Sequence, residues 1–323
     1  MCTYNGVRFL DDQLNSLASQ ERKPDELVVC DDCSTDTTIA TLRQFAVRAP
    51  FPVHIHQNTA RLGSTKNFEQ AMSLCQGDII ALCDQDDIWD AQKLRLTEEC
   101  FLRSPSVGLV FTDAEVVDEA ANSLGYNLWS RLKFDTALQS RLKSSDAFAI
   151  LSEKQIVTGA TMAFRAEFRD LVLPIPLDIP LIHDGWIALM ISVVGSVDII
   201  ERPMIKYRQH QSQQLGAPTN DPAAVSAGIL ERAKRRNSFA EEIKKLEAAH
   251  ERILGHKDRY EAKHEAYLKH RLKHMQKRVE ISRRKFAGIA MAFAELLRGR
   301  YHRYSSGFYS FAKDVFQETR NNE

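Results

Sequence analysis

The sequence predicts an α/β fold in roughly its first two thirds, followed by a helical region. Through the first 110 residues, short apolar runs alternate with segments of helical periodicity. The run Leu27-Val28-Val29-Cys30 is apolar throughout, which is typical of a strand buried in a parallel sheet. From about residue 225, Lys, Arg, Glu and Ala dominate and Gly and Pro are scarce, which favours helices.

Strands are predicted at the apolar runs, and helices between them. The predicted strands are 27–30, 53–56, 79–83, 107–111, 159–164 and 196–200. The predicted helices are 7–19, 35–47, 65–75, 91–102, one beginning at His183-Asp184, and one or two across 229–285. Ser34, Thr35 or Asp36 would cap the second helix. This βαβα order indicates a Rossmann-like, mostly parallel sheet covered by helices on both faces.

Composition limits the class of protein. The 323 residues include 43 Lys/Arg and 43 Asp/Glu, so the whole chain has no net charge. Residues 225–323 contain 23 Lys/Arg and 13 Asp/Glu, which gives this region a net charge of about +10. We expect a cytoplasmic protein, because no apolar run is long enough to span a bilayer and no signal peptide is recognisable. Reduced, buried cysteines are expected, and the Cys30/Cys33 pair lacks the second pair that a zinc site needs.

Two acidic clusters follow predicted strands directly. Asp31-Asp32 follows the strand ending at Cys30, and Asp84-Gln85-Asp86-Asp87 follows the strand ending at Cys83. Ligands of such sheets bind beyond the carboxyl ends of the strands. Carboxylates packed this closely repel one another unless a cation joins them, and oxygen ligands favour Mg²⁺ or Mn²⁺. The alternative interpretation is a solvated acidic turn that caps the next helix.

Six motifs occur in order along residues 1–217. They are Thr3-Tyr4-Asn5-Gly6, Asp31-Asp32-Cys33-Ser34-Thr35-Asp36, Arg61-Leu62-Gly63 with Asn67-Phe68, Cys83-Asp84-Gln85-Asp86-Asp87-Ile88-Trp89, His183-Asp184-Gly185-Trp186, and Tyr207-Arg208-Gln209-His210. Together they resemble the family 2 glycosyltransferases of GT-A fold. The closest resemblance is to the bacterial rhamnosyltransferase-like enzymes of surface-polysaccharide (O-antigen or capsule) synthesis. Each motif is weak alone, but six in order are specific.

The resemblance implies roles on the donor side. The residues that would approach the nucleotide-sugar are Thr3, Tyr4, Asn5, Asp32, Arg61, Lys66, Asp84 and Asp87. Asp32 would accept from the imide of the base, and Asp87 would contact the sugar. Asp86 and Asp84 resemble the metal-binding DxD pair, with His210 as a further ligand of Mg²⁺ or Mn²⁺. Arg61 and Lys66 are equally interpretable as surface cations.

The resemblance also implies an inverting transfer of a hexosyl group. Asp184 would remove the proton from the acceptor hydroxyl. Gly159, His183 and Trp186 would lie on the acceptor side, with Trp186 stacking on a sugar. The interpretations without catalysis are helix capping for Asp184 and core packing for His183 and Trp186.

The expected organisation is a GT-A domain at 1–217 and a basic helical region at 218–323. The first strand is expected to be a stub. Expected partners are a dTDP- or UDP-sugar, with rhamnose as the leading sugar, and a glycan or lipid-linked glycan acceptor. The basic region predicts peripheral contact with an anionic membrane at the inner face of the cell membrane, or a homo-oligomer, and no nucleic acid. Alternatives are a degenerate transferase serving as a scaffold and a nucleotidyltransferase, whose Gly-rich phosphate loop is missing after the first strand.

Overall fold

The computed structural model describes residues 1–210 and 239–316. The chain divides into two compact units, Met1–Leu177 with Leu181–Val225, and Asp178–Pro180 with Ser226–Glu323. The predicted boundary at 217/218 and the predicted helical residues 229–238 lie outside the described residues. Within the described residues, no helix is both long and apolar enough to cross a membrane.

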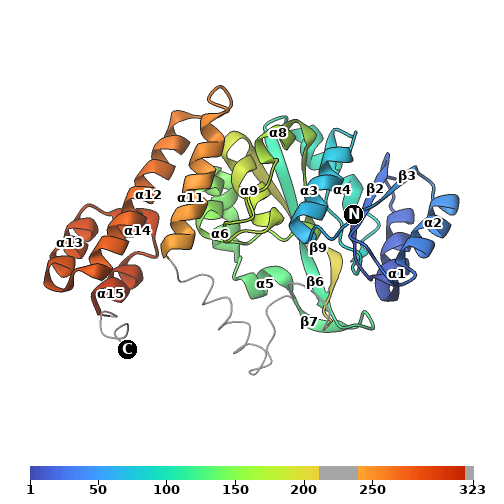
Figure 1. The fold of residues 1–323 in the computed structure, drawn as a ribbon, viewed down its shortest axis with the longest axis horizontal. Coiled ribbons are helices and arrows are strands. Elements are labelled where there is room, and N and C mark those ends of the chain that lie inside the picture. Colours follow the sequence, from blue (N-terminus) through green and yellow to red (C-terminus); the bar gives the residue numbers. More distant parts are fainter. Residues whose placement is uncertain (211–238, 317–323) are drawn as a thin grey trace. The chain divides into compact units, whose positions relative to one another are not determined.

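The first unit opens with a parallel sheet of order β1-β2-β3, as predicted (Figure 1). Its strands are β1 (Cys2–Thr3), β2 (Leu27–Asp31) and β3 (Val53–Gln57). Helices α1 (Val7–Ala18) and α2 (Thr38–Arg48) share a core cluster with Leu27 and Val29. Helix α3 (Ser64–Leu74) also packs against β2, since Asn67 Nδ2 donates to the Cys30 carbonyl oxygen at 2.8 Å. Successive strand residues face opposite sides, so helices cover both faces.

A second, mixed sheet carries the other strands of this unit. They are β4 (Ile79–Ala81), β5 (Ile88–Trp89), β6 (Val107–Val117), β7 (Ser123–Asn127), β8 (Met162–Arg165) and β9 (Ser196–Arg208), in the order β4-β8-β6-β9-β5 with β7 beside β6. Only the β6–β9 pair is parallel in this sheet. The Cys2 N–H donates to the Cys83 carbonyl oxygen at 3.3 Å, which joins the ends of the two sheets.

The remaining helices of this unit are α4 (Lys93–Arg103), α5 (Leu128–Leu132), α6 (Thr136–Arg141), α7 (Ala147–Glu153), α8 (Arg169–Val172) and α9 (His183–Val194), with a π-helix at Leu142–Asp146 and 3₁₀ turns at Gly159–Thr161 and Ala166–Phe168. Of these, the sequence predicts α4 and α9 but not the four short helices between them. Helix α9 begins at His183, as predicted. The strand predicted at 159–164 begins only at Met162, after the first 3₁₀ turn.

The start of α2 differs from the prediction. The helix begins at Thr38 with Thr37 at its N-cap position, although the predicted residue Asp36 does accept from the Thr38 N–H at 2.9 Å. Ser34 Oγ accepts from the Asn5 N–H at 2.9 Å, and the Thr35 N–H donates to Asn5 Oδ1 at 2.8 Å. These polar groups therefore hold the end of β1 against the loop after β2.

The second unit is helical, as its composition predicts. Its helices are α11 (Phe239–Leu254), α12 (Ala262–Arg283), α13 (Lys285–Leu297), α14 (Arg300–Tyr304) and α15 (Phe308–Phe316). Much of its interior is charged. Arg278 Nε and Nη2 donate to the two oxygens of Asp314 at 2.7 and 2.8 Å, and His274 Nδ1 lies 2.9 Å from Glu295 Oε2.

Trp186 does not reach the surface, so the predicted stacking on a sugar is wrong. Its side chain is fully buried in α9, and its indole N–H donates to the Val172 carbonyl oxygen at 2.8 Å. A buried indole needs such an acceptor. The packing interpretation accounts for this residue.

We therefore predict that Trp186→Phe lowers the free energy of unfolding by about 1–3 kcal/mol, because it removes a buried hydrogen bond and part of a core side chain. Urea denaturation measures this change. The acceptor KM of the folded variant should equal that of the wild type. A raised KM with unchanged stability would restore the stacking role.

Candidate active site

The ends of β1 and β4 meet through one amide side chain. Gln85 Oε1 accepts from the Tyr4 N–H at 2.8 Å, and Gln85 Nε2 donates to the Tyr4 carbonyl oxygen at 3.1 Å. A Cβ atom on Gly6 would lie 2.1 Å from Gln85 Oε1, so a side chain at position 6 would displace the Gln85 amide. The middle residue of the DxD segment thus fixes the acidic loop to the first motif.

Three carboxylates converge beyond this junction. Burial, together with the negative charges of Asp86 and Asp184, raises the pKa of Asp84 to about 7. Burial likewise raises the pKa of Asp184 to about 6, although its oxygens accept from the Gly185 and Gly159 N–H groups at 2.6 and 3.2 Å. The loop after β4 and the first turn of α9 therefore face one another across a site that is short of positive charge.

His210 completes this group from the end of β9. Its Nε2 lies 2.7 Å from Asp86 Oδ2, and both side chains are largely buried. The ring also contacts Phe9, with the ring centroids 4.7 Å apart. The structure thus brings the predicted residues Asp86 and His210 together although 124 positions separate them in the sequence.

Arg208 is a functional residue that the sequence reasoning missed. Its side chain is almost completely buried, with Nε donating to the Asp86 carbonyl oxygen at 2.8 Å and Nη2 to Asp12 Oδ2 at 2.7 Å. Nη1 donates to the Glu119 carbonyl oxygen at 2.5 Å. Arg208 therefore positions the DxD loop against α1 and β9. The sequence feature that could have revealed Arg208 is its place in the motif Tyr207-Arg208-Gln209-His210.

Asp87 is not placed to contact a donor sugar, so that prediction needs correction. Its side chain is fully buried and Oδ1 accepts from the Arg208 N–H at 3.2 Å. Burial and the charges of Asp86 and Asp84 raise its pKa well above the usual range. Buried Lys93, whose pKa burial lowers to about 8, interacts electrostatically with Asp87 from below the loop. Asp87 therefore supports the DxD loop from the core and does not line the candidate site.

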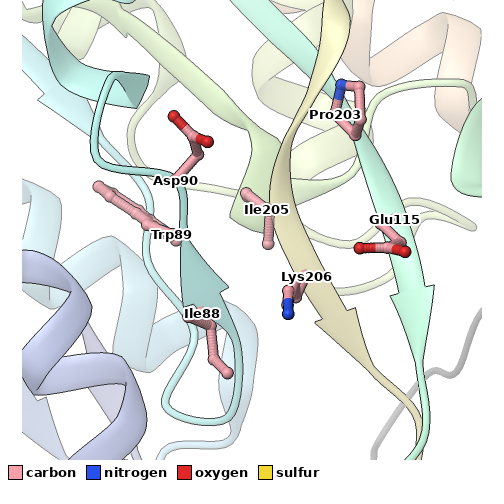
Figure 2. Close-up of a pocket in the computed structure, with 7 residues that line it drawn as sticks. All are labelled: Ile88, Trp89, Asp90, Glu115, Pro203, Ile205 and Lys206. Atoms are coloured by element: carbon pink, nitrogen blue, oxygen red, sulfur yellow. The ribbon is translucent and has the colours of Figure 1, made fainter. Parts of the chain in front are cut away.

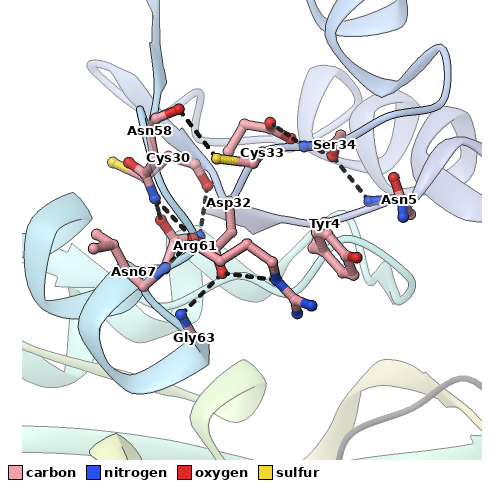
Figure 3. Close-up of polar contacts among 12 residues, drawn as sticks. Tyr4, Asn5, Cys30, Asp32, Cys33, Ser34, Asn58, Arg61, Gly63 and Asn67 are labelled. Carbon is pink, nitrogen blue, oxygen red and sulfur yellow. Dashed lines mark hydrogen bonds and ion pairs between the residues drawn. The ribbon is translucent and has the colours of Figure 1, made fainter.

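Asp32 holds the loop after β3 (Figure 3). Its Oδ1 accepts from the Leu62 N–H at 2.6 Å and from Asn58 Nδ2 at 3.1 Å, and Oδ2 accepts from the Gly63 N–H at 2.9 Å. Gly63 has φ +78°, a conformation that favours glycine. Both oxygens are engaged, so a base imide would have to share one of them.

The other donor-side residues fall into two groups. Tyr4 is partly exposed, and the Arg61 guanidinium lies over its ring at 3.9 Å from the centroid (Figure 3). By contrast, Thr3 is buried and its hydroxyl donates to Asp31 Oδ2 at 2.8 Å, which corrects its predicted contact with the base. Asn5 braces the β2 loop with φ +47°, and Lys66 pairs with Glu69 at 2.8 Å.

His183 and Gly159 support the turn that carries Asp184. The buried His183 ring stacks on Phe68 with centroids 4.2 Å apart, and burial lowers its pKa to about 3. A Cβ atom on Gly159 would lie 2.9 Å from His183 Nε2. Neutral His183 thus fills the core behind Asp184, and Gly159 lets the 3₁₀ turn approach it.

The DxD loop also borders a small cavity of about 150 Å³ (Figure 2). It is lined by Ile88, Trp89, Asp90, Glu115, Pro203, Ile205 and Lys206. Pockets for ligands of nucleotide size usually measure about 300–1,000 Å³. None of Asp84, Asp86, Asp184 and His210 lines it, so this cavity is distinct from the strand-end site.

The residues present fit a divalent cation only in part. In the described parts of the chain, no group of three or more His, Cys, Asp and Glu side chains lies close enough to hold a metal ion. Mg²⁺ and Mn²⁺ often use one or two protein ligands together with substrate phosphates. Asp86 and His210 offer such a pair. The donor set thus fits a cation that arrives with a diphosphate.

Comparison with known proteins agrees with this geometry. The model of the glycosyl transferase family 2 domain matches residues 1–167, and the chain belongs to this family. It is 26% identical over 234 residues to an uncharacterized glycosyltransferase of Nostoc sp., covering 72% of this chain and 68% of the relative. It is 27% identical over 229 residues to the dTDP-rhamnosyl transferase RfbG of Shigella flexneri, covering 67% and 74%.

Solved structures share the GT-A fold. TarS 1–349 of S. aureus, in complex with UDP-GlcNAc, superposes with a TM-score of 0.55 and 17% identity, covering 99% of this chain and 91% of that chain. The mannosyltransferase PcManGT of Pyrobaculum calidifontis, in complex with GDP-Man and Mn²⁺, gives a TM-score of 0.51 at 18% identity, covering 100% and 86%. The predicted fold and family are confirmed.

The raised pKa of Asp184 predicts a pH-dependent change in stability. A carboxyl group whose pKa is raised in the folded state destabilises that state as the pH rises above its unfolded pKa of about 4, and the loss is complete above its folded pKa of about 6. Without added metal, Asp184→Asn should therefore raise the free energy of unfolding at pH 8 by up to about 3 kcal/mol, at ~1.4 kcal/mol per pKa unit. The gain should shrink towards pH 4.

Urea denaturation at pH 4, 6 and 8 measures this effect. Asp11→Asn, at an exposed position of α1, serves as the control and should change little. An Asp184→Asn variant that is less stable than the wild type at pH 8 would show that the hydrogen bonds to Gly159 and Gly185 outweigh burial.

Proposed function

We propose that this glycosyltransferase is inverting and metal-dependent, and that it moves a sugar from a nucleoside diphosphate donor to a hydroxyl of a cell-surface polysaccharide. The observation that carries the proposal is the convergence of Asp184 on the Asp84–Asp86 loop, from elements about 100 residues apart in the sequence. One side of the site offers a base, and the other offers ligands for a cation and a diphosphate.

The donor would bind at the carboxyl ends of β1 and β4. The Tyr4 ring and the Arg61 guanidinium form a stacking surface for the base, since a flat aromatic face and a planar cation both pack on a π-system. Asp86 and His210 would hold the divalent cation. The cation would neutralise the charge that develops on the departing diphosphate.

The acceptor hydroxyl would approach from the Asp184 side. Asp184 removes the proton as the hydroxyl oxygen attacks the anomeric carbon opposite the diphosphate, which inverts that centre. The Gly159 and Gly185 N–H groups hold the carboxylate, and partial burial keeps its pKa near the working pH. His183 is neutral and packs behind this turn, so it keeps Asp184 in place without taking the proton.

The sugar is proposed from similarity alone. The likeness to a dTDP-rhamnosyl transferase supports rhamnose from a dTDP donor, whereas TarS was solved with UDP-GlcNAc. A chondroitin synthase of Escherichia coli, 30% identical over 139 residues, and a teichuronic acid glycosyltransferase of Bacillus subtilis, 26% identical over 142 residues, support a polysaccharide acceptor. A glycan or lipid-linked glycan acceptor, self-association and peripheral membrane contact remain parts of the proposal.

Donor specificity is tested by hydrolysis of dTDP-, UDP- and GDP-sugars with Mn²⁺, Mg²⁺ or EDTA. One donor should be hydrolysed slowly with metal and not with EDTA. Asp86→Ala should lose this activity, while the control Asp11→Ala keeps it. Folded protein that neither binds nor hydrolyses any donor would favour a degenerate transferase that acts as a scaffold, and release of pyrophosphate from a nucleoside triphosphate would favour a nucleotidyltransferase.

The role of Asp184 gives a separate prediction. Asp184→Asn should lower kcat by about 10²–10⁴-fold while donor binding is retained, because the variant lacks only the base. For the wild type, log kcat should fall as the pH decreases through the Asp184 pKa, since protonation removes the base. Calorimetric donor titration and a pH–rate profile measure both effects. An Asp184→Asn variant with wild-type kcat would exclude this residue as the base.

A further inference from the structure

The helical unit has its charged and aromatic residues in unusual places. Its interior holds the ion pair Arg278–Asp314 and the hydrogen-bonded pair His274–Glu295, and the Tyr301 hydroxyl donates to Asp314 Oδ2 at 2.7 Å. Its surface displays large apolar side chains, namely Phe286, Phe293, Leu297, Phe308, Tyr309 and Phe316. Exposed apolar residues of this size are costly in water when they gather on one face.

These residues do gather on α13. Phe286, Phe293 and Leu297 are 89%, 50% and 86% exposed, and their spacing of seven and four residues places them on one face of the helix. Phe293 also contacts Phe311 of α15, with centroids 5.0 Å apart, and Phe308 contacts the same ring at 5.4 Å. The α13 residues and Phe308 therefore form one continuous surface, the apolar stripe.

The charge around the stripe identifies its partner. Residues 283–316 contain seven Lys/Arg, including exposed Arg283, Arg298 and Arg303, and two carboxylates. Both carboxylates, Glu295 and Asp314, are buried in ion pairs. Arg284 pairs with Glu280 just before this segment, and Arg298 and Arg300 both pair with Glu295, so the stripe is bordered by an excess of cations over carboxylates. A second copy of the chain would bring like charges together, whereas an anionic surface would be attracted.

We propose that the apolar stripe docks on an anionic lipid bilayer. Helix α13 has 13 residues, fewer than the roughly 20 that a spanning helix needs, so it would lie in the interface. Its phenylalanine and leucine side chains enter the acyl boundary while the arginines contact lipid phosphates. Each such cation typically contributes about 1 kcal/mol near an anionic surface. This inference rests on the peripheral membrane contact in the proposed function, for which it names the surface, and it does not depend on the proposed donor chemistry.

Vesicle co-sedimentation of the full chain tests the proposal. The vesicles are phosphatidylcholine alone and a mixture of phosphatidylcholine and phosphatidylglycerol at about 7:3. The wild type should bind the anionic vesicles at least about tenfold more tightly than the neutral ones, and 0.5 M NaCl should weaken the binding. Failure to bind anionic vesicles overturns the proposal and leaves an acidic protein as the partner.

Two double variants separate the stripe from general hydrophobicity. Phe286→Ser with Leu297→Ser should weaken vesicle binding at least about tenfold, because the apolar insertion is lost. The matched control, Val47→Ser with Leu102→Ser, removes two apolar residues that are 91% and 76% exposed in the other unit and should bind as the wild type does. Circular dichroism verifies that each variant is folded.

Sedimentation velocity without lipid tests whether a second copy of the chain covers the stripe. The wild type and the stripe variant should sediment alike. A wild-type oligomer that the stripe variant converts to a monomer, with vesicle binding unchanged, would show that a second copy covers the stripe and would overturn the proposal. Equal vesicle binding by the stripe variant and the wild type would overturn it as well.

Discussion

The buried guanidinium of Arg208 is the constraint on which the candidate site depends. Burying a charged side chain costs several kcal/mol unless its N–H groups find acceptors. Here the acceptors are the Asp86 carbonyl oxygen, the Glu119 carbonyl oxygen and the Asp12 carboxylate. The DxD loop, the end of β6 and helix α1 must therefore meet at the end of β9. The same strand end delivers His210 to Asp86.

This arrangement leaves the site with excess negative charge. Arg208 uses its hydrogen bonds on backbone groups and on Asp12, so it supports the acidic loop without neutralising Asp84. Asp184 adds a further carboxylate from α9, with a pKa that is also raised. A folded state tolerates such repulsion when a ligand relieves it, and a cation with a diphosphate matches that need. Burial raises the pKa of these carboxylates. The same raised pKa gives Asp184 the basicity that a general base needs.

Much of the fold could be predicted from the sequence because its signals are local. The strand at Leu27–Asp31 and the helix from His183 follow from an apolar run and a helix-start pattern. The mixed second sheet could not be predicted, since β8 pairs antiparallel with β4 and β6 through contacts distant in the sequence. Within the site, the type of a residue did not indicate whether its side chain is buried or exposed. Asp87 and Trp186 match a motif, yet their side chains lie in the core.

Arg208 was missed for a related reason, because its function lies in acceptors that only the fold brings together.

The most direct test is the dependence of the free energy of unfolding on Mn²⁺, with a nucleoside diphosphate present, for the wild type and Arg208→Lys. We predict that Mn²⁺ stabilises the wild type and that the folded variant needs about 10–100-fold more metal for the same gain, as is typical when a group that supports the ligands is changed. A wild type that saturating Mn²⁺ does not stabilise, or a variant that responds identically, would contradict this prediction.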